Sequence, residues 1–147
     1  MRSKLLNAGP PCTFALILDT GEEAVECLSR FAKEHSLHAT QLSAIGAFSR
    51  VTLGYFDFAL KDYRHIEIDE QVELVSLLGD FALSKGEPKL HAHAVVAKSD
   101  GSAYGGHLLA AVVRPTLEVV LTESPAWLHR EVDRETGLAL IRITEKA

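Results

Sequence analysis

Cysteine is scarce in this chain, and its two residues, Cys12 and Cys27, do not stand in a CxxC spacing. Two thiols could pair, but nothing else indicates a disulfide framework, so we expect a reduced, cytoplasmic setting. Long apolar runs are lacking as well, since no segment approaches the roughly 20 apolar residues that a membrane span needs. Residues 1–7 carry positive charge but no apolar core of the kind found in signal peptides. We therefore expect a chain that neither crosses a membrane nor depends on disulfides.

A cluster of basic residues is also missing. The chain has 15 Lys and Arg against 20 Asp and Glu, a formal net charge of -5, and the basic residues are scattered among the acidic ones. A domain that binds nucleic acid mainly through its phosphates is usually basic on one face. The composition therefore disfavours autonomous DNA binding, although a basic patch built by oligomerisation stays open. The sequence also lacks a nucleotide-binding glycine loop and a pairing of cysteine with a nearby histidine that would indicate a nucleophile and its base.

Length and composition indicate a single globular domain over residues 1–147. Hydrophobic residues make up 47% and charged residues 24%, and no repeat, linker or low-complexity tract interrupts the chain. Such values are ordinary for globular proteins, and the length suffices for one substantial core.

The hydrophobic pattern predicts mostly strands and one main helix, hence an α+β fold with a mostly antiparallel β-sheet. The helix is expected to begin with Thr20 as N-cap and Glu23 in a capping box, and to run to about His35. His35 and His38 near its end are interpreted as favourable charges at a helix C-terminus, and His65 as solvent-facing. The expected strands are residues 13–19, 66–68, 72–83, 117–122 and 138–143, with a bulge at Gly79 in the third of them. Residues 39–58 are interpreted as two paired strands joined by a bend at 46–48. Residues 127–132 are interpreted as a short polar helix or turn.

Residues 90–111 are the most informative stretch, because they read as a β-hairpin that carries three histidines. His91 and His93 alternate with alanine and so share one face of the first strand. If Gly101 occupies the left-handed position of a three-residue loop, His93 falls opposite His107, with Cβ atoms roughly 4.5–5.5 Å apart. A slip of one residue would turn His107 to the other face, and a bulge at Gly105-Gly106 would alter its aim. Tyr104 is expected in the core, with a place in the wall of the site as the alternative.

Several segments of the chain resemble the plant-and-prokaryote conserved (PPC) domain family. They are Leu-His-Ala-His at 90–93, Asp-Gly at 100–101, Gly-Gly-His-Leu at 105–108 and the strand at 117–121, together with Ile-Gly-Ala at 45–47 and residues 71–79. The resemblance covers nearly the whole chain. It implies a PPC-domain-like α+β fold, assembly as a homotrimer and, as in prokaryotic members, a metal site at His91, His93 and His107. The Arg-Gly-Arg-Pro AT-hook of the plant proteins is absent from the sequence, so a DNA-binding role would be inherited from the family label alone.

Three neutral imidazoles suit zinc or another divalent transition metal, and three protein ligands leave a fourth position for water or a small molecule. Glu87, Asp100 and Glu118 are candidates for orienting the ligands or moving a proton. Glu118 is as well explained as a solvent-facing residue or a partner of Arg114 or Arg142. The structural alternative for the histidines is two half-exposed strand residues and one packing residue.

Three functions follow from these observations. The first is a trimeric metal-binding protein that acts on a small molecule, with its substrate and any hydrolase or lyase activity unassigned. The second is a module associated with DNA or transcription, and the third is a scaffold that assembles with itself or a partner.

Overall fold

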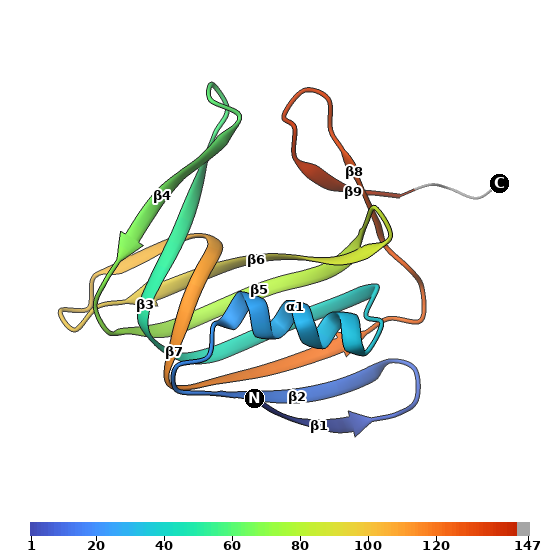
Figure 1. Cartoon of the computed structure of the whole chain (residues 1–147), viewed down its shortest axis with the longest axis horizontal. Helices are drawn as coiled ribbons and strands as arrows, with labels where there is room; N and C mark the ends of the chain where they lie inside the picture. The colour runs from blue at the N-terminus through green and yellow to red at the C-terminus, as the bar shows by residue number, and fades with distance from the viewer. Residues whose placement is uncertain (144–147) are drawn as a thin grey trace.

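The computed structural model describes residues 1–143, which form one highly curved sheet of nine strands and one α-helix (Figure 1). The mostly antiparallel sheet and the main helix agree with the predicted α+β class. The strands are β1 (Arg2–Asn7), β2 (Cys12–Asp19), β3 (Ala39–Asp57), β4 (Asp62–Ile68), β5 (Val72–Ser84), β6 (Glu87–Ala97), β7 (Ala103–Glu123), β8 (His129–Val132) and β9 (Ala139–Arg142), and the helix is α1 (Ala24–Glu34).

The strand order is β1-β2-β7-β3-β5-β8-β9, with β4 paired to β3. Strand β6 pairs with both β5 and β7, so the ladders β3-β5-β6-β7 close into a ring. All pairings are antiparallel except that of β5 with β8. Because of this closure, the hairpin of β6 and β7 is held from both sides.

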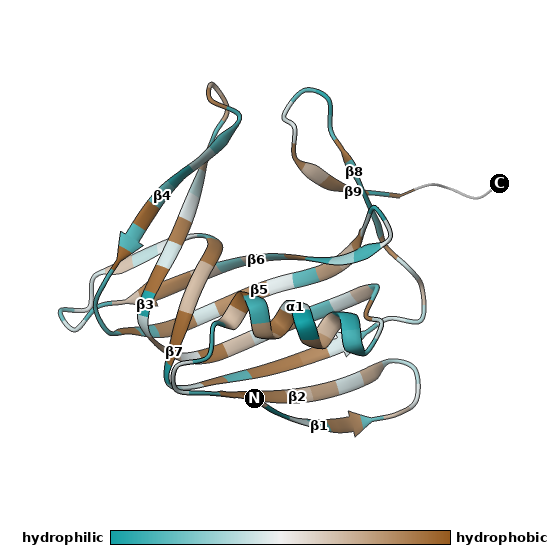
Figure 2. Ribbon diagram, viewed as in Figure 1, coloured by the Kyte–Doolittle hydropathy of each residue, from teal (hydrophilic) through white to brown (hydrophobic). Residues whose placement is uncertain are grey.

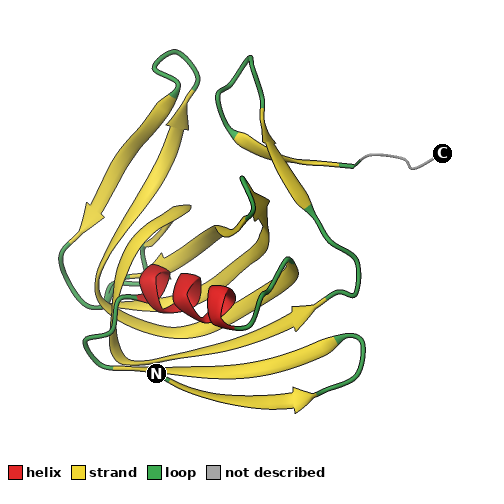
Figure 3. Ribbon diagram, turned by 45° about the vertical axis from the view of Figure 1, so that its right-hand side comes forward, coloured by secondary structure: helices red, strands yellow, loops and turns green. Residues whose placement is uncertain are grey.

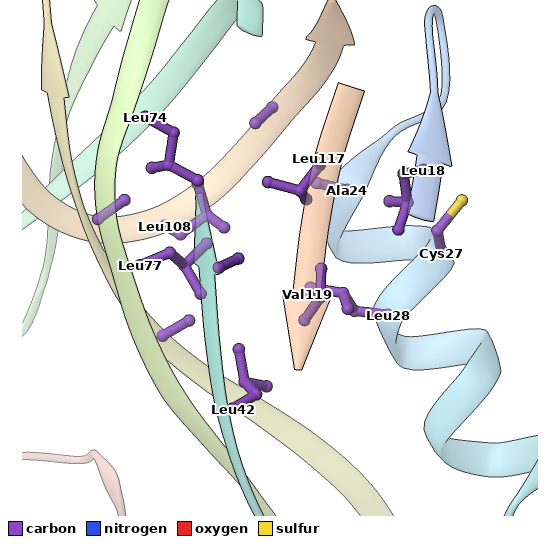
Figure 4. Packing of buried hydrophobic residues seen from close by; sticks show 14 of the residues in the cluster. Leu18, Ala24, Cys27, Leu28, Leu42, Leu74, Leu77, Leu108, Leu117 and Val119 are labelled. Carbon is purple, nitrogen blue, oxygen red and sulfur yellow. The ribbon is translucent and has the colours of Figure 1, made fainter. Parts of the chain in front are cut away.

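Helix α1 lies in the hollow of the curved sheet (Figure 3) and closes the hydrophobic core. Figure 2 shows hydrophobic and hydrophilic residues alternating along the helix, which is the pattern of an amphipathic element. Ala24, Cys27, Leu28, Phe31 and Ala32 are its buried residues. Leu28 lies near Val119 of β7, and Leu42, Leu77 and Leu108 continue the core toward the other strands (Figure 4).

The predicted helix start was wrong by three residues, because Glu23 is the N-cap in place of Thr20. The Glu23 carboxylate accepts hydrogen bonds from the backbone N–H groups of Glu26 (2.6 Å) and of Ala111 on β7 (2.8 Å). One side chain therefore caps the helix and ties it to the sheet.

Residues 39–57 form one continuous strand, β3, and the prediction of two strands paired with each other was wrong. The strand is irregular between Ala44 and Gly46, and it pairs with β7 on both sides of this point. A Cβ atom at Gly46 would overlap the Thr116 carbonyl, so glycine is what allows β7 to approach here. Strand β7 likewise runs without interruption through Pro115, where a separate strand was expected to begin.

Two further predictions were wrong in detail. Gly79 holds no bulge: it pairs regularly with Ala92, and the irregularity of β5 lies between Leu74 and Ser76. A Cβ at Gly79 would lie 2.7 Å from the His91 carbonyl oxygen, which explains why glycine stands there. Residues 129–132 form strand β8, where a helix or turn was expected.

Two hairpins, β3–β4 and β8–β9, project from the body of the sheet on the same side (Figure 1). The second is anchored by Arg130, whose guanidinium pairs with Asp80 of β5. Within residues 1–143, no helix has the length and apolar character required to cross a membrane.

Candidate metal centre

The hairpin of β6 and β7 has the register predicted from its turn. The Lys98 N–H donates to the Ser102 carbonyl (2.9 Å), the Gly101 N–H donates to the Lys98 carbonyl (2.9 Å), and Gly101 has a φ of +82°. The pairing then runs without a shift to His93 opposite His107. The predicted pairing is thus confirmed, and Gly105-Gly106 introduce no bulge between β6 and β7.

The three histidines lie together on the face of the sheet turned away from α1. Ala92, Ala94 and Val96 of β6 are buried in the core, so the alternating residues His91 and His93 point to the opposite face. The ring centroids are 5.1 Å apart for His91 and His93, 5.2 Å for His91 and His107, and 5.5 Å for His93 and His107. One nitrogen of each ring lies within 4.8 Å of the others. We call these three residues the imidazole cluster.

His107 is the most enclosed member of the cluster. The Tyr63 ring of β4 stacks on it at a centroid distance of 4.7 Å, and this is possible because Gly54 beneath Tyr63 has no Cβ. The Nδ1 atom of His107 is buried and has no hydrogen-bond partner among the described residues. Burial, together with the neighbouring His91 and His93, lowers the pKa of His107 from 6.5 to about 4. His107 is therefore neutral at physiological pH.

His91 is half-buried, and burial also lowers its pKa, with the Arg130 guanidinium as the next contribution. Asp80 lies directly opposite His91 in the ladder of β5 and β6, on the same face. His93 is exposed and lies opposite Leu78. Exposure thus differs within the cluster: His107 and His91 are partly buried, and His93 is exposed.

The residues of the cluster fit a metal ion. Neutral imidazole nitrogens are good ligands for zinc and for other late divalent metals. A buried nitrogen without a partner, such as His107 Nδ1, costs free energy unless something binds it. Ligands from three side chains leave a tetrahedral ion one open position.

The three carboxylates considered as accessory groups are directed elsewhere. Glu87 pairs with Lys33 of α1 (3.1 Å), and Asp100 accepts hydrogen bonds from the backbone (2.9 Å) and hydroxyl (2.6 Å) of Ser102 within the turn. Glu118 is exposed and pairs in the ladders with Ile17 and Ile45, in agreement with its interpretation as a solvent-facing residue. Tyr104, expected in the core, is 40% exposed and lies under the Lys98 ammonium.

Residues that the sequence did not single out surround the cluster. Tyr63 and Arg130 come from the two projecting hairpins, and no local pattern places either one near the histidines. Asp80 was accessible in principle, because extending the register from His91 to the preceding strand puts it opposite. The expected bulge at Gly79 prevented this prediction, because a bulge there would have shifted the register between His91 and Asp80.

A cavity of about 130 Å³ adjoins the imidazole cluster. It lies between the two projecting hairpins, with β6 and β7 beneath it. We call it the side cavity, and it is lined by Tyr63, Lys89, Leu90, His91, His107, Arg130, Leu138, Ala139 and Leu140.

Fold and cluster together define a mostly β protein whose outward-facing histidines stand in position to hold a metal. Comparison with known families identifies the family to which the chain belongs. Residues 7–125 match the model of the Plants and Prokaryotes Conserved (PCC) domain, and the chain belongs to this family, as the resemblance in its sequence implied.

Two solved structures illustrate the likeness. A protein from Archaeoglobus fulgidus described as metal-containing is 35% identical, with a TM-score of 0.84 over 95% of this chain and 99% of that one. A protein from Bacteroides thetaiotaomicron described as a candidate DNA-binding protein is 27% identical, with a TM-score of 0.88 over 95% of this chain and 96% of that one.

A curated relative is much longer than the chain. The bifunctional protein GlmU of a Synechococcus strain is 31% identical over 149 residues, which cover 99% of this chain and 23% of that protein. The chain therefore spans about a quarter of the length of the curated relative that it matches.

Proposed function

We propose that this protein binds a divalent transition metal, zinc in the first place, through His91, His93 and His107. The observation that carries the proposal is the convergence of three ring nitrogens within 4.8 Å of one another, one of them on His107, whose Nδ1 atom is buried. The description of the Archaeoglobus fulgidus relative as metal-containing supports the same function.

The metal would be held by three imidazole nitrogens, one from each histidine of the imidazole cluster. A bound zinc ion at such a centre polarises a ligand or lowers the pKa of a bound water. The protein's own contribution is to fix the three rings on one rigid hairpin, to cover His107 with Tyr63 and to leave His93 open to the surface. A small molecule would reach the fourth position from the exposed side or from the side cavity.

We also propose that the protein is a homotrimer. An outer apolar face, made by Ile45, Val75, Leu78, Val95 and Val120, lies on the same side of the sheet as the imidazole cluster. Ile45 and Leu78 are 59% and 62% exposed, and both line one hollow of this face together with Val75 and Val120. Contiguous exposed apolar patches of this kind often mark interaction surfaces. Coverage of this face by other copies of the chain would bury it.

Metal analysis of the purified protein tests the proposed centre. We expect one zinc ion or other divalent metal ion per chain by mass spectrometry, and loss of about tenfold or more in zinc affinity for each of His91→Ala, His93→Ala and His107→Ala. His65→Ala is the matched control, because His65 is an exposed strand histidine on β4 outside the cluster. A wild-type protein that takes up no metal, or a His91→Ala variant that binds zinc as tightly as His65→Ala, would refute the proposal.

DNA binding is the competing function, favoured by the description of the Bacteroides relative. The net charge of -5 opposes it. Fluorescence anisotropy with duplex DNA at low salt separates the two functions, since binding through phosphates weakens steeply as salt is added. We expect no binding to the DNA, and a steep salt dependence would support the competing function instead.

A further inference from the structure

The side cavity beside the imidazole cluster carries features that the metal site alone does not explain. We propose that it is a subsite for the carboxylate of a small organic monoanion, whose other end reaches the metal. This inference rests on the proposed metal function and adds the class of ligand to it.

Arg130 is the central residue of the subsite. It is only 7% exposed, and it lines the side cavity next to His91 and His107. One terminal nitrogen pairs with Asp80 and the other donates to the Ala139 carbonyl (3.0 Å). The Nε atom is buried and has no hydrogen-bond partner within residues 1–143. A buried, partly unsatisfied guanidinium at a cavity wall is suited to bind a carboxylate oxygen.

The charges around the cavity favour an anion. Asp80 offsets the charge of Arg130. The positive charge that remains comes from Lys89 at the cavity wall and from the metal ion that we propose. A carboxylate is attracted by this charge, whereas the more highly charged phosphate dianion would meet Asp80 and would need more donors than Arg130 has free.

Volume and lining restrict the size of the ligand. A cavity of roughly 150 Å³ is enough to admit benzene, and the side cavity measures about 130 Å³. Leu138, Leu140 and the Tyr63 ring provide apolar walls. The ligand therefore carries a carboxylate on a short, partly apolar skeleton.

Part of the subsite lies in a different region of the sequence from the imidazole cluster. Arg130 and residues 138–140 belong to the β8–β9 hairpin, which lies beyond residues 7–125 matched by the family model. The imidazole cluster lies inside that range. The metal centre thus lies wholly within the matched range, whereas the carboxylate subsite also needs Arg130 and residues 138–140 from beyond it.

Calorimetric titration of the zinc-loaded protein tests the subsite. Lactate is the probe, lactamide is the uncharged molecule of the same size, and inorganic phosphate is the competing anion. We expect lactate to bind about tenfold or more tightly than lactamide and more tightly than phosphate. Lys89→Gln should weaken lactate binding several-fold, whereas Lys4→Gln, which removes an exposed charge on β1, should leave it unchanged.

Arg130 variants and metal content separate this inference from the proposed function. Arg130→Gln should retain one zinc per chain and lose the preference of lactate over lactamide, and Arg130→Lys should recover part of it. A wild-type protein that binds zinc but binds lactate no better than lactamide refutes the subsite alone. A protein without metal refutes the proposed function first. If Arg130→Gln does not fold, the wild-type preference and the comparison of Lys89→Gln with Lys4→Gln decide.

Discussion

The position of His107 in the β6–β7 hairpin can be predicted from the sequence, whereas the residues that surround its ring cannot. Its place opposite His93 follows from counting outward from the turn at Gly101, because antiparallel pairing is regular once the loop is known. Its burial depends on Tyr63, which comes from another hairpin and stacks on the ring over Gly54. A single sequence carries no signal for such a contact, since the pairing of β3 with β4 has to be known first.

The buried His107 predicts how the metal-free protein responds to acid. Its pKa is about 4 in the folded chain and 6.5 when unperturbed, so the unfolded chain takes up the proton first as the pH falls. This contribution to the free energy of unfolding is complete above pH 6.5 and is lost between pH 6.5 and about 4. We expect a loss of about 1–2 kcal/mol, allowing for partial exposure.

Urea denaturation in the presence of a chelator measures this effect at pH 7 and pH 4.5. His107→Gln removes the titrating group, and its free energy of unfolding should depend less on pH over this range than that of the wild type. Equal pH dependence in the two proteins would show that His107 titrates normally.

At the scale of elements, short-range pairing was predictable and long-range pairing was not. The β6–β7 hairpin is predicted by its turn residues and by the alternation of histidine with alanine along its first strand. Strand β3 was divided at Gly46 because glycine commonly marks a break, whereas here it marks the close approach of the β7 backbone. Strand β8 is short and polar, and its position depends on Leu83, which pairs with His129, and on the contact of Arg130 with Asp80.

The Asp80–Arg130 pair predicts the stability of the β8–β9 hairpin. Asp80→Ala leaves a buried guanidinium without its partner, which costs about 3–5 kcal/mol when both groups are fully buried. Because Asp80 is 31% exposed, we expect a loss of about 2 kcal/mol in the free energy of unfolding. Hydrogen exchange should also accelerate at the amides of Arg130 and Val132, which belong to β8.

Asp69→Ala serves as the control for this measurement, because Asp69 is an exposed carboxylate in the loop between β4 and β5. It should change the unfolding free energy by less than about 0.5 kcal/mol. If Asp80→Ala behaves like Asp69→Ala, the hairpin is anchored by its backbone contacts alone.

On the scale of the whole molecule, the outer apolar face and the imidazole cluster share one side of the sheet. Leu78 of this face lies directly opposite His93, the exposed ring of the cluster. Assembly through the outer apolar face would therefore reduce the exposure of His93 as well. The sequence could not indicate this, because alternation alone does not distinguish strands buried on both faces from strands that keep one apolar face exposed.

Substitution within the outer apolar face tests the proposed trimer. The wild type should sediment with three times the 16.0 kDa mass of the chain, and Ile45→Lys should shift the population toward monomer because a lysine would be desolvated in the interface. Val132→Lys, at an equally exposed valine on β8, should leave the mass unchanged. A wild-type protein that sediments as a monomer contradicts the proposed assembly.

The close spacing of the histidines along the chain has a consequence for redesign. His91, His93 and His107 come from a single hairpin, while the side-cavity walls at Tyr63, Arg130 and Leu138 come from the two projecting hairpins. The walls can therefore be exchanged by mutagenesis while the metal-binding hairpin is kept.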